Sequence, residues 1–324
     1  MLRLPPLRHE APGTLDEAVA LLAVDGAMLS AGGTDLVPNL KRRQYPDAAT
    51  IVSLRRIPGM AGVRVESDGS LHIGSLTKLS SLAEHESIPL VVREAALSVA
   101  SPQIRNQGTI GGNLCVDTRC NWLNVPQTWR EAAEPCLKAG GETCWVAPAK
   151  KDCWAVSSSD LAPVLVALGA EVQLVGSGGR RSMPLEDFYR NDGMAHLTKG
   201  ADEIITGVVV PPSSDMRASY RKLRRRGSID FPILGVAVVA SFDDDQVCTA
   251  SRIVLGSVAS SPLRVPEAEE VLVGRPFGSE VIAEASEAAR KFARPLNNTD
   301  LTSRYRKRMI PVYVTRALGD LVEG

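Results

Sequence analysis

The chain has 324 residues, with 37 Lys and Arg against 37 Asp and Glu, so its net charge at pH 7 is zero. A protein without a basic excess is a poor candidate for binding nucleic acid, because the phosphate backbone is recognised mainly through positive charge. The length predicts two domains, with three as the alternative. The contents of 44% hydrophobic and 23% charged residues are typical of a soluble globular protein, and no apolar run approaches the roughly 20 residues that span a bilayer.

The first two thirds of the sequence alternate between short strands and helices. Thr14 and Glu17 form a capping box, in which each side chain accepts a hydrogen bond from the other residue's backbone amide, and this predicts a helix start. Apolar runs predict the strands and helical periodicity predicts the helices. The predicted helices cover residues 15–24, 76–86, 89–99 and 160–168, and the predicted strands cover residues 27–31, 51–54, 71–73, 170–175 and 203–210.

The pattern changes after Pro211 and Pro212, which end the preceding strand because proline lacks the backbone donor of a sheet ladder. Residues 233–242 and 250–258 predict a hairpin across three consecutive aspartates. Helices are predicted at residues 267–273, 279–293 and 301–321. The change predicts one domain over residues 1–215 and a second over residues 216–324.

Cysteine and tryptophan are concentrated in one stretch. Five of the six cysteines lie within residues 115–153, and all four tryptophans lie within residues 122–154. The segment 116–156 shows no regular period, so it predicts an irregular insert that needs an internal source of order. A metal centre would supply that order, and scattered thiols are the alternative. Residues 1–6 contain no apolar signal core, so we expect a cytoplasmic protein whose cysteines are not disulfide-bonded.

Two glycine pairs predict loops that approach a ligand. Gly32 and Gly33 directly follow a predicted strand, and Gly111 and Gly112 lie in a second loop. Backbone without a Cβ can come close to a ligand, and successive amides can hold phosphate, so the two loops could bind a pyrophosphate. Neither loop fits G-x-G-x-x-G or G-x-x-x-x-G-K-[ST], which disfavours a Rossmann site and excludes a P-loop. Two ordinary tight turns are the alternative.

These motifs occur in an order that resembles a known family. The first glycine loop, S-P-Q-I-R-N at residues 101–106 before the second loop, and S-D-L-A-P at residues 159–163 resemble the FAD-binding subunits of the molybdenum hydroxylase (xanthine oxidase) family. K-L-R-R-R at residues 222–226 resembles that family's C-terminal domain. The resemblance runs from Thr14 to Leu321. It implies an α+β fold with a two-subdomain FAD-binding domain, of the vanillyl-alcohol-oxidase/CO-dehydrogenase-flavoprotein type, and a C-terminal α+β domain.

The resemblance implies FAD as the cofactor and no catalytic residue on this chain. It implies that the glycine loops bind the diphosphate, that Asp160 lies near the ribityl chain and flavin, and that Lys222 faces the electron-rich edge of the flavin. From the residues alone, Asp160 could instead cap a helix and Lys222 could belong to a basic surface. The implied FAD-binding residues are Met28, Leu29, Ser30, Ala31, Gly32, Gly33, Thr34, Asp35, Thr109, Ile110, Gly111, Gly112, Asn113, Asp160 and Lys222.

The insert resembles one branch of the family. Most members join the second glycine loop to the Asp160 motif by a short link, whereas the β subunits of 4-hydroxybenzoyl-CoA reductases carry an insert with a [4Fe-4S] cluster. The resemblance implies four ligands, Cys120, Cys136, Cys144 and Cys153. Their spacing, C-x15-C-x7-C-x8-C, lacks a close pair, so the residues alone leave zinc and iron–sulfur open. Cys115 is expected to pack near the flavin, and Cys248 is expected to be buried in a hairpin strand.

This branch implies an electron-transfer subunit. Electrons would pass from ferredoxin through the [4Fe-4S] cluster and FAD to two [2Fe-2S] clusters on a small subunit and molybdenum on a large subunit, in a dimer of heterotrimers. The reaction would remove the phenolic hydroxyl of an aromatic acyl-CoA during aromatic degradation. One alternative is an NAD- or quinone-linked molybdenum hydroxylase with electrons flowing the other way. Another is a zinc-stabilised interaction protein without redox activity.

Overall fold

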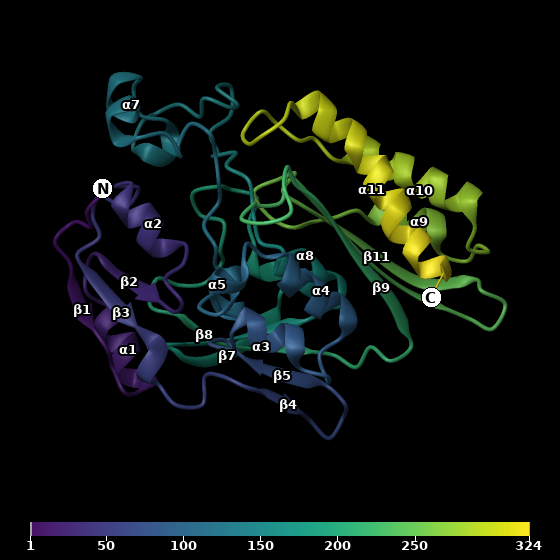
Figure 1. Cartoon of the computed structure of the whole chain (residues 1–324), viewed down its shortest axis with the longest axis horizontal. Coiled ribbons are helices and arrows are strands. Elements are labelled where there is room, and N and C mark those ends of the chain that lie inside the picture. The colour runs from purple at the N-terminus through teal and green to yellow at the C-terminus, as the bar shows by residue number, and fades with distance from the viewer. Residues whose placement is uncertain (1, 324) are drawn as a thin grey trace.

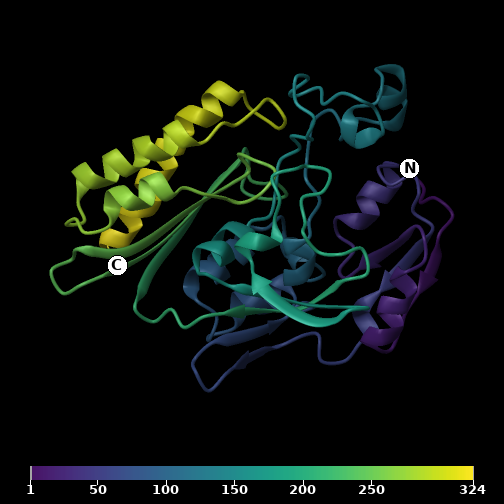
Figure 2. The ribbon, with the colours of Figure 1, turned by 180° about the vertical axis from the view of Figure 1, so that it is seen from behind.

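Short strands separated by turn residues assemble into three sheets in the computed structural model, which describes residues 2–323. The outer bounds of the two predicted domains, residues 1 and 324, lie outside this range. A three-stranded sheet and a four-stranded sheet lie at opposite ends of the molecule, with a five-stranded sheet between them (Figure 1, Figure 2). The predicted α+β fold class is therefore confirmed. No helix within residues 2–323 is long and apolar enough to cross a membrane.

The first sheet is parallel and has the order β1-β3-β2. The capping box of Thr14 and Glu17 is confirmed at the start of the first helix. The second helix was not predicted because it contains Pro38, but this proline falls in the first helical turn, where no amide is needed. The elements are β1 (Arg8–Glu10), α1 (Leu15–Leu22), β2 (Ala27–Ser30), α2 (Leu36–Lys41), β3 (Thr50–Ser53) and the 3-10 helix η1 (Leu54–Arg56).

The second sheet is antiparallel and has the order β4-β5-β8-β6-β7. The helix predicted at residues 76–86 is shorter, because Lys78 forms a bridge with Thr109 and the amide of Ile110 donates to the carbonyl of Thr77. The elements are β4 (Val63–Val65), β5 (Leu71–Gly74), α3 (Leu79–Glu84), α4 (Leu90–Ser98), α5 (Pro102–Arg105), α6 (Ile110–Leu114), α8 (Leu161–Ala167), β6 (Glu171–Gly176), β7 (Gly179–Pro184), η3 (Glu186–Phe188) and β8 (Ile204–Val210).

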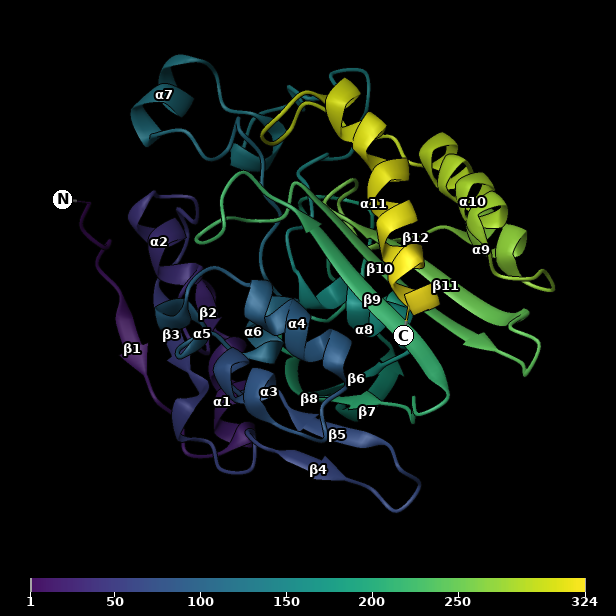
Figure 3. The same cartoon turned by 45° about the vertical axis from the view of Figure 1, so that its right-hand side comes forward.

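The third sheet has the order β12-β11-β10-β9 and includes the predicted hairpin. Helix α11 lies along β9 and β10 and packs beside α10 (Figure 3). The first strand of this sheet in chain order, β9, is absent from the sequence prediction, because charged and apolar residues alternate irregularly along it. The elements are β9 (Met216–Leu223), β10 (Leu234–Phe242), β11 (Cys248–Gly256), β12 (Leu263–Arg264), α9 (Pro266–Leu272), α10 (Ser279–Phe292) and α11 (Ser303–Glu323).

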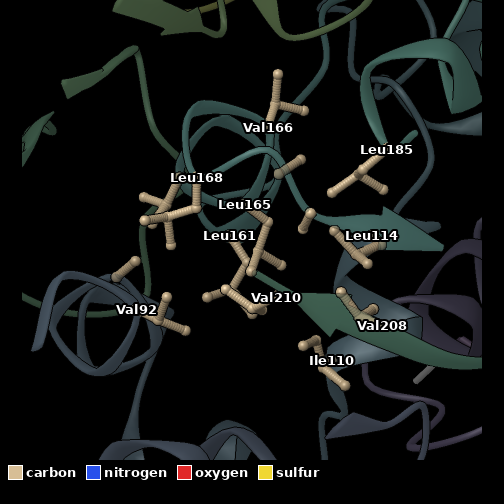
Figure 4. Packing of buried hydrophobic residues seen from close by; sticks show 14 of the residues in the cluster. Val92, Ile110, Leu114, Leu161, Leu165, Val166, Leu168, Leu185, Val208 and Val210 are labelled. Carbon is tan, nitrogen blue, oxygen red and sulfur yellow. The ribbon is translucent and has the colours of Figure 1, made fainter. Parts of the chain in front are cut away.

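Helix α8 is the centre of the largest hydrophobic core. All seven of its residues are buried, and it contacts both β10 and β11 of the third sheet. On its other side, Leu161 and Leu165 gather with Val210 of β8, beside Val92 of α4 (Figure 4). An apolar helix of this kind is stable only when neighbouring elements cover it on all sides, and α4 and α6 do so together with the two sheets. Its burial therefore ties the third sheet to the first part of the chain.

The cysteine-rich insert leaves and re-enters the fold at one point. Arg119 and Val156 exchange two backbone hydrogen bonds of 2.8 and 2.7 Å, which close residues 120–155 into a long loop. The loop contains only α7 (Gln127–Ala132) and the 3-10 helix η2 (Leu137–Ala139). It stands between α2 and the segment before α11 (Figure 1).

We expect the substitution Leu165→Ala to lower the free energy of unfolding by about 2–5 kcal/mol, because it leaves a cavity in a fully buried site of α8. Chemical denaturation followed by circular dichroism measures this change. Leu90→Ala is the matched control, because Leu90 is 64% exposed. Equal effects of the two substitutions would contradict the central role of α8.

Candidate functional site

The first glycine loop is shaped by two different requirements. Gly32 lies so close to Gln107 that a Cβ would overlap the carbonyl oxygen of that residue. Gly33 has a φ of +72°, a backbone conformation that residues with side chains rarely adopt. The loop therefore packs against the segment that leads into the second glycine loop, and the two loops meet as a pair.

Arg55 holds the first loop from outside. Its Nε donates to the carbonyl of Ala31 at 3.1 Å, and its guanidinium also donates to the carbonyl of Gly32 at 3.4 Å and to the side chain of Gln107 at 2.8 Å. In a planar trans peptide the C=O and the following N–H point in opposite directions, so the amides of Gly32 and Gly33 face away from Arg55. Two adjacent amides in this arrangement suit an anionic ligand.

The second glycine loop forms the start of α6. The hydroxyl of Thr109 accepts a hydrogen bond from the amide of Gly112 at 3.1 Å. A Cβ on Gly111 would lie 2.8 Å from the Cβ of Ser75, so only glycine fits there. The side chain of Asn113 is also fixed, because its oxygen accepts a hydrogen bond of 2.7 Å from the hydroxyl of Ser159. The residues just before α8 therefore fix the orientation of this loop.

Both loops line one cavity of about 410 Å³. Ile110 does not line it, because its side chain is fully buried in the main core. Of the predicted cofactor-binding residues, the following line the cavity: Met28, Leu29, Ser30, Ala31, Gly32, Gly33, Thr34, Asp35, Thr109, Gly111, Gly112 and Asn113. Lining residues that sequence reasoning did not single out for this role include Tyr45, Ser75, Ala100, Asp117, Lys199 and Phe231.

Side chains from distant segments complete the cavity wall. Arg119 forms an ion pair with Asp35 of the first loop and stacks over the ring of Phe231 at 4.1 Å from the ring centroid. Phe231 lies between β9 and β10, so the C-terminal part of the chain contributes to the same cavity. Tyr45 donates to the carboxylate of Asp117 at 3.0 Å, and burial together with this negative charge raises the pKa of the phenol.

Asp160 and Lys222 do not line the cavity, and they pair with each other. The Nζ of Lys222 donates to the Asp160 carboxylate at 2.9 Å and to the carbonyl of Ser98 at 3.0 Å. Tyr220 donates to the second carboxylate oxygen at 2.7 Å. The side chain of Asp160 makes no capping hydrogen bond to helix α8, so the helix-capping alternative is wrong. Each side chain of the ion pair is only 4% exposed, so the pair joins the two parts of the chain out of contact with water.

The structure brings the four predicted metal ligands together. Cys120, Cys136, Cys144 and Cys153 all line one small cavity, and all four are buried free thiols. Burial raises the pKa of the Cys120 and Cys153 thiols to about 11. Cys115 instead lines the larger cavity between the glycine loops. Within residues 2–323, no group of three or more His, Cys, Asp or Glu side chains has an arrangement that could hold a metal ion.

Polar contacts fix the insert that carries these thiols. Arg130 is buried and donates to four backbone carbonyls, two within the insert and those of Arg42 and Arg43 at the end of α2. On the other side, the side-chain amide of Asn298 donates to the carbonyl of Trp154 at 2.6 Å. The insert is therefore anchored to both domains.

Comparison with known proteins places this chain in a family. The model described as "FAD binding domain in molybdopterin dehydrogenase" matches residues 6–213, and "CO dehydrogenase flavoprotein C-terminal domain" matches residues 218–321. The FAD subunit of nicotinate dehydrogenase from Eubacterium barkeri is 31% identical over 282 residues, covering 84% of this chain and 81% of that protein. The carbon monoxide dehydrogenase medium chain from Hydrogenophaga pseudoflava is 29% identical over 321 residues, covering 97% and 96%. A solved structure of carbon monoxide dehydrogenase from the same organism matches with a TM-score of 0.81 and 27% identity, covering 99% of each chain.

We expect Gly32→Ala to reduce the amount of FAD retained after gel filtration at least tenfold, because the added methyl overlaps the Gln107 carbonyl and displaces the loop. The ratio of flavin absorbance to protein absorbance measures retention. Gly178→Ala is the control, since nothing lies within 4 Å of a Cβ there. Full retention in the Gly32 variant would contradict the role of this loop.

We expect Asp160→Asn to lower the free energy of unfolding by about 3–5 kcal/mol, because it leaves the buried ammonium of Lys222 without a counter-charge. The double variant Asp160→Asn/Lys222→Met removes both charges and should recover part of the loss. Glu284→Gln is the control and should cost less than about 1 kcal/mol, because its ion pair with Arg275 is exposed. Urea denaturation distinguishes these results, and equal losses in the single and double variants would contradict the buried pair.

Proposed function

The chain belongs to the family of FAD-binding subunits of molybdenum hydroxylases and carbon monoxide dehydrogenase medium chains, and from this membership we propose a role like that of the β subunit of 4-hydroxybenzoyl-CoA reductase. Membership makes it the FAD-containing subunit of a molybdenum hydroxylase-type oxidoreductase. The proposed role is to pass electrons from ferredoxin, by way of a [4Fe-4S] cluster and FAD, to [2Fe-2S] and molybdenum centres on partner subunits.

Two features of the cavity between the glycine loops support FAD binding there. The backbone at Gly32 and Gly111 comes so close to neighbouring segments that no side chain fits, and the amides beside Gly32 are turned away from Arg55. We propose that the loops 28–35 and 109–113 hold the diphosphate, and that the Asp160–Lys222 pair acts on the flavin although neither residue lines the cavity. When bound, FAD supplies transfer of one or two electrons, and the chain supplies its binding and orientation.

The observation that carries the more specific proposal is the convergence of four thiols in the insert. Cys120, Cys136, Cys144 and Cys153 are the donor set of an iron–sulfur cluster, and they share one cavity although 15, 7 and 8 residues separate them. Four thiolates suit zinc and iron–sulfur equally, so the shared cavity supports a metal centre, and the resemblance to the reductase branch is what favours a cluster. The residues present therefore fit the proposed group.

We propose that the chain works in a dimer of heterotrimers. The large subunit would hold the molybdenum cofactor and the substrate, and the small subunit would hold two [2Fe-2S] clusters. Support comes from the relatives named medium chains, a name that implies larger and smaller partners. We also propose that the two domains divide near residue 215, between Pro212 and the start of β9 at Met216.

A second candidate function follows from the names of the relatives. They include a nicotinate dehydrogenase and a nicotine 6-hydroxylase, whose names describe substrate oxidation. An NAD- or quinone-linked hydroxylase would send electrons outward through the flavin. Steady-state assays of the purified complex distinguish the two directions: turnover with NAD or a quinone supports the second candidate, and turnover with a reduced viologen alone supports the first.

We expect the anaerobically purified chain to contain about four irons together with flavin, as one [4Fe-4S] cluster requires. The substitution Cys144→Ser should reduce the iron content at least fourfold, because it removes one ligand from the shared cavity. Metal analysis and visible absorption measure iron and flavin separately.

The controls for this prediction are Cys115→Ser and Cys248→Ala. Both cysteines lie outside the thiol cavity, so the iron content should remain at the level of the unsubstituted protein. A colourless protein that contains zinc and no iron would overturn the cluster assignment. Equal loss of iron in the three variants would show that the iron is not held by the insert.

A further inference from the structure

One ion pair connects the two candidate cofactor sites. Asp117 lines the cavity between the glycine loops, and Lys138 lines the cavity of the four thiols. The Nζ of Lys138 lies 2.5 Å from the Asp117 carboxylate, and the two side chains are only 11% and 20% exposed. A single pair of opposite charges therefore reaches from one cavity wall to the other.

Lys138 is fixed in place by several acceptors. In addition to Asp117, its ammonium donates to the hydroxyl of Thr118 at 2.6 Å and to the carbonyl of Gly193 at 2.8 Å. Gly193 in turn packs on the thiol site: its amide donates to the carbonyl of Cys153 at 2.7 Å, and a Cβ there would lie 2.9 Å from the Cys153 sulfur. The same group of contacts therefore positions the positive charge and one of the thiols.

Asp117 is fixed on the side of the larger cavity. Its carboxylate accepts from the hydroxyl of Tyr45 at 3.0 Å and from the amide of Thr118 at 2.8 Å. His196 lies 3.9 Å away, and burial lowers its pKa to about 4, so it is neutral at pH 7. Lys138 is therefore the cation paired with Asp117, and the negative end of the pair lies at the flavin cavity.

We propose that Lys138 and Asp117 are positioning residues whose fixed charges set the difference in potential between the thiolate site and the flavin. The proposal rests on the proposed function, because it requires a cluster in the insert. The positive end lies at the thiol cavity and favours an added electron there, whereas the negative end lies at the flavin cavity and disfavours one. Both side chains are poorly exposed to water, and the lower effective dielectric constant strengthens both electrostatic effects.

The signs of the expected shifts distinguish this role from a merely structural one. Lys138→Gln removes the positive charge and leaves the carboxylate unpaired, so the potentials of both centres should fall. Asp117→Asn leaves the positive charge unpaired, so both potentials should rise. The double variant should lower the potential of the iron centre and raise that of the flavin. Lys138→Arg keeps the charge and should leave both potentials close to those of the unsubstituted protein.

The test is a redox titration of the anaerobically purified full chain, with the iron centre followed by electron paramagnetic resonance and the flavin by visible absorption. For Lys138→Gln we expect about a tenfold change in the equilibrium constant for one-electron reduction of the iron centre, which corresponds to about 59 mV. Lys150→Gln is the matched control, because Lys150 lies in the same insert but is exposed. It should shift neither potential.

Three outcomes would overturn the proposal. Unchanged potentials in Lys138→Gln, with iron and flavin at the levels of the unsubstituted protein, would overturn the coupling and leave the proposed function intact. If Lys138→Gln does not fold, an unchanged flavin potential in Asp117→Asn would have the same meaning. A native chain that retains FAD but no iron would overturn the cluster of the proposed function, and the coupling with it.

Discussion

The burial of helix α8 between two sheets is the constraint on which the rest of the structure depends. Its seven residues are all buried, so the helix has no face that water can cover. It therefore needs β10 and β11 on one side, and α4, α6 and core residues of the five-stranded sheet on the other. Asp160 at its start is buried with it, and the counter-charge comes from Lys222 on β9. Ser159, just before, holds Asn113 of the second glycine loop. Packing of one apolar helix thus determines both the domain arrangement and one wall of the cavity.

The insert achieves order by a different route. Its own apolar cluster of buried residues is small, with Cys120, Leu123, Cys153 and Ala155. Buried cationic and amide side chains that donate to backbone carbonyls do most of the anchoring, and Arg130 alone reaches four of them. Because the two ends of the insert meet at one backbone bridge, its length carries a small additional entropic cost.

The position of the insert places the four thiols beside the cavity between the glycine loops. The chain runs from Asn113, which lines the cavity, through Asp117 to Cys120 in only seven residues. Two sites with different donor chemistry therefore share one short segment and one ion pair. The chain nevertheless matches the FAD-binding domain model of the family and the solved carbon monoxide dehydrogenase structure, so the insert is accommodated without a change of the parent fold.

The sequence by itself determined those features that depend on neighbouring residues. The capping box at Thr14, the glycine loops, the hairpin across the aspartates and the irregular insert each follow from local chemistry. Only the tertiary structure decided which side chains meet: Asp160 pairs with Lys222, Phe231 reaches the cavity, and Lys138 joins Asp117. The tertiary structure also decided that the side chain of Ile110 points into the main hydrophobic core. Some of these contacts join residues more than a hundred positions apart. No local sequence pattern carries information about such contacts, because the packing of the whole chain determines them.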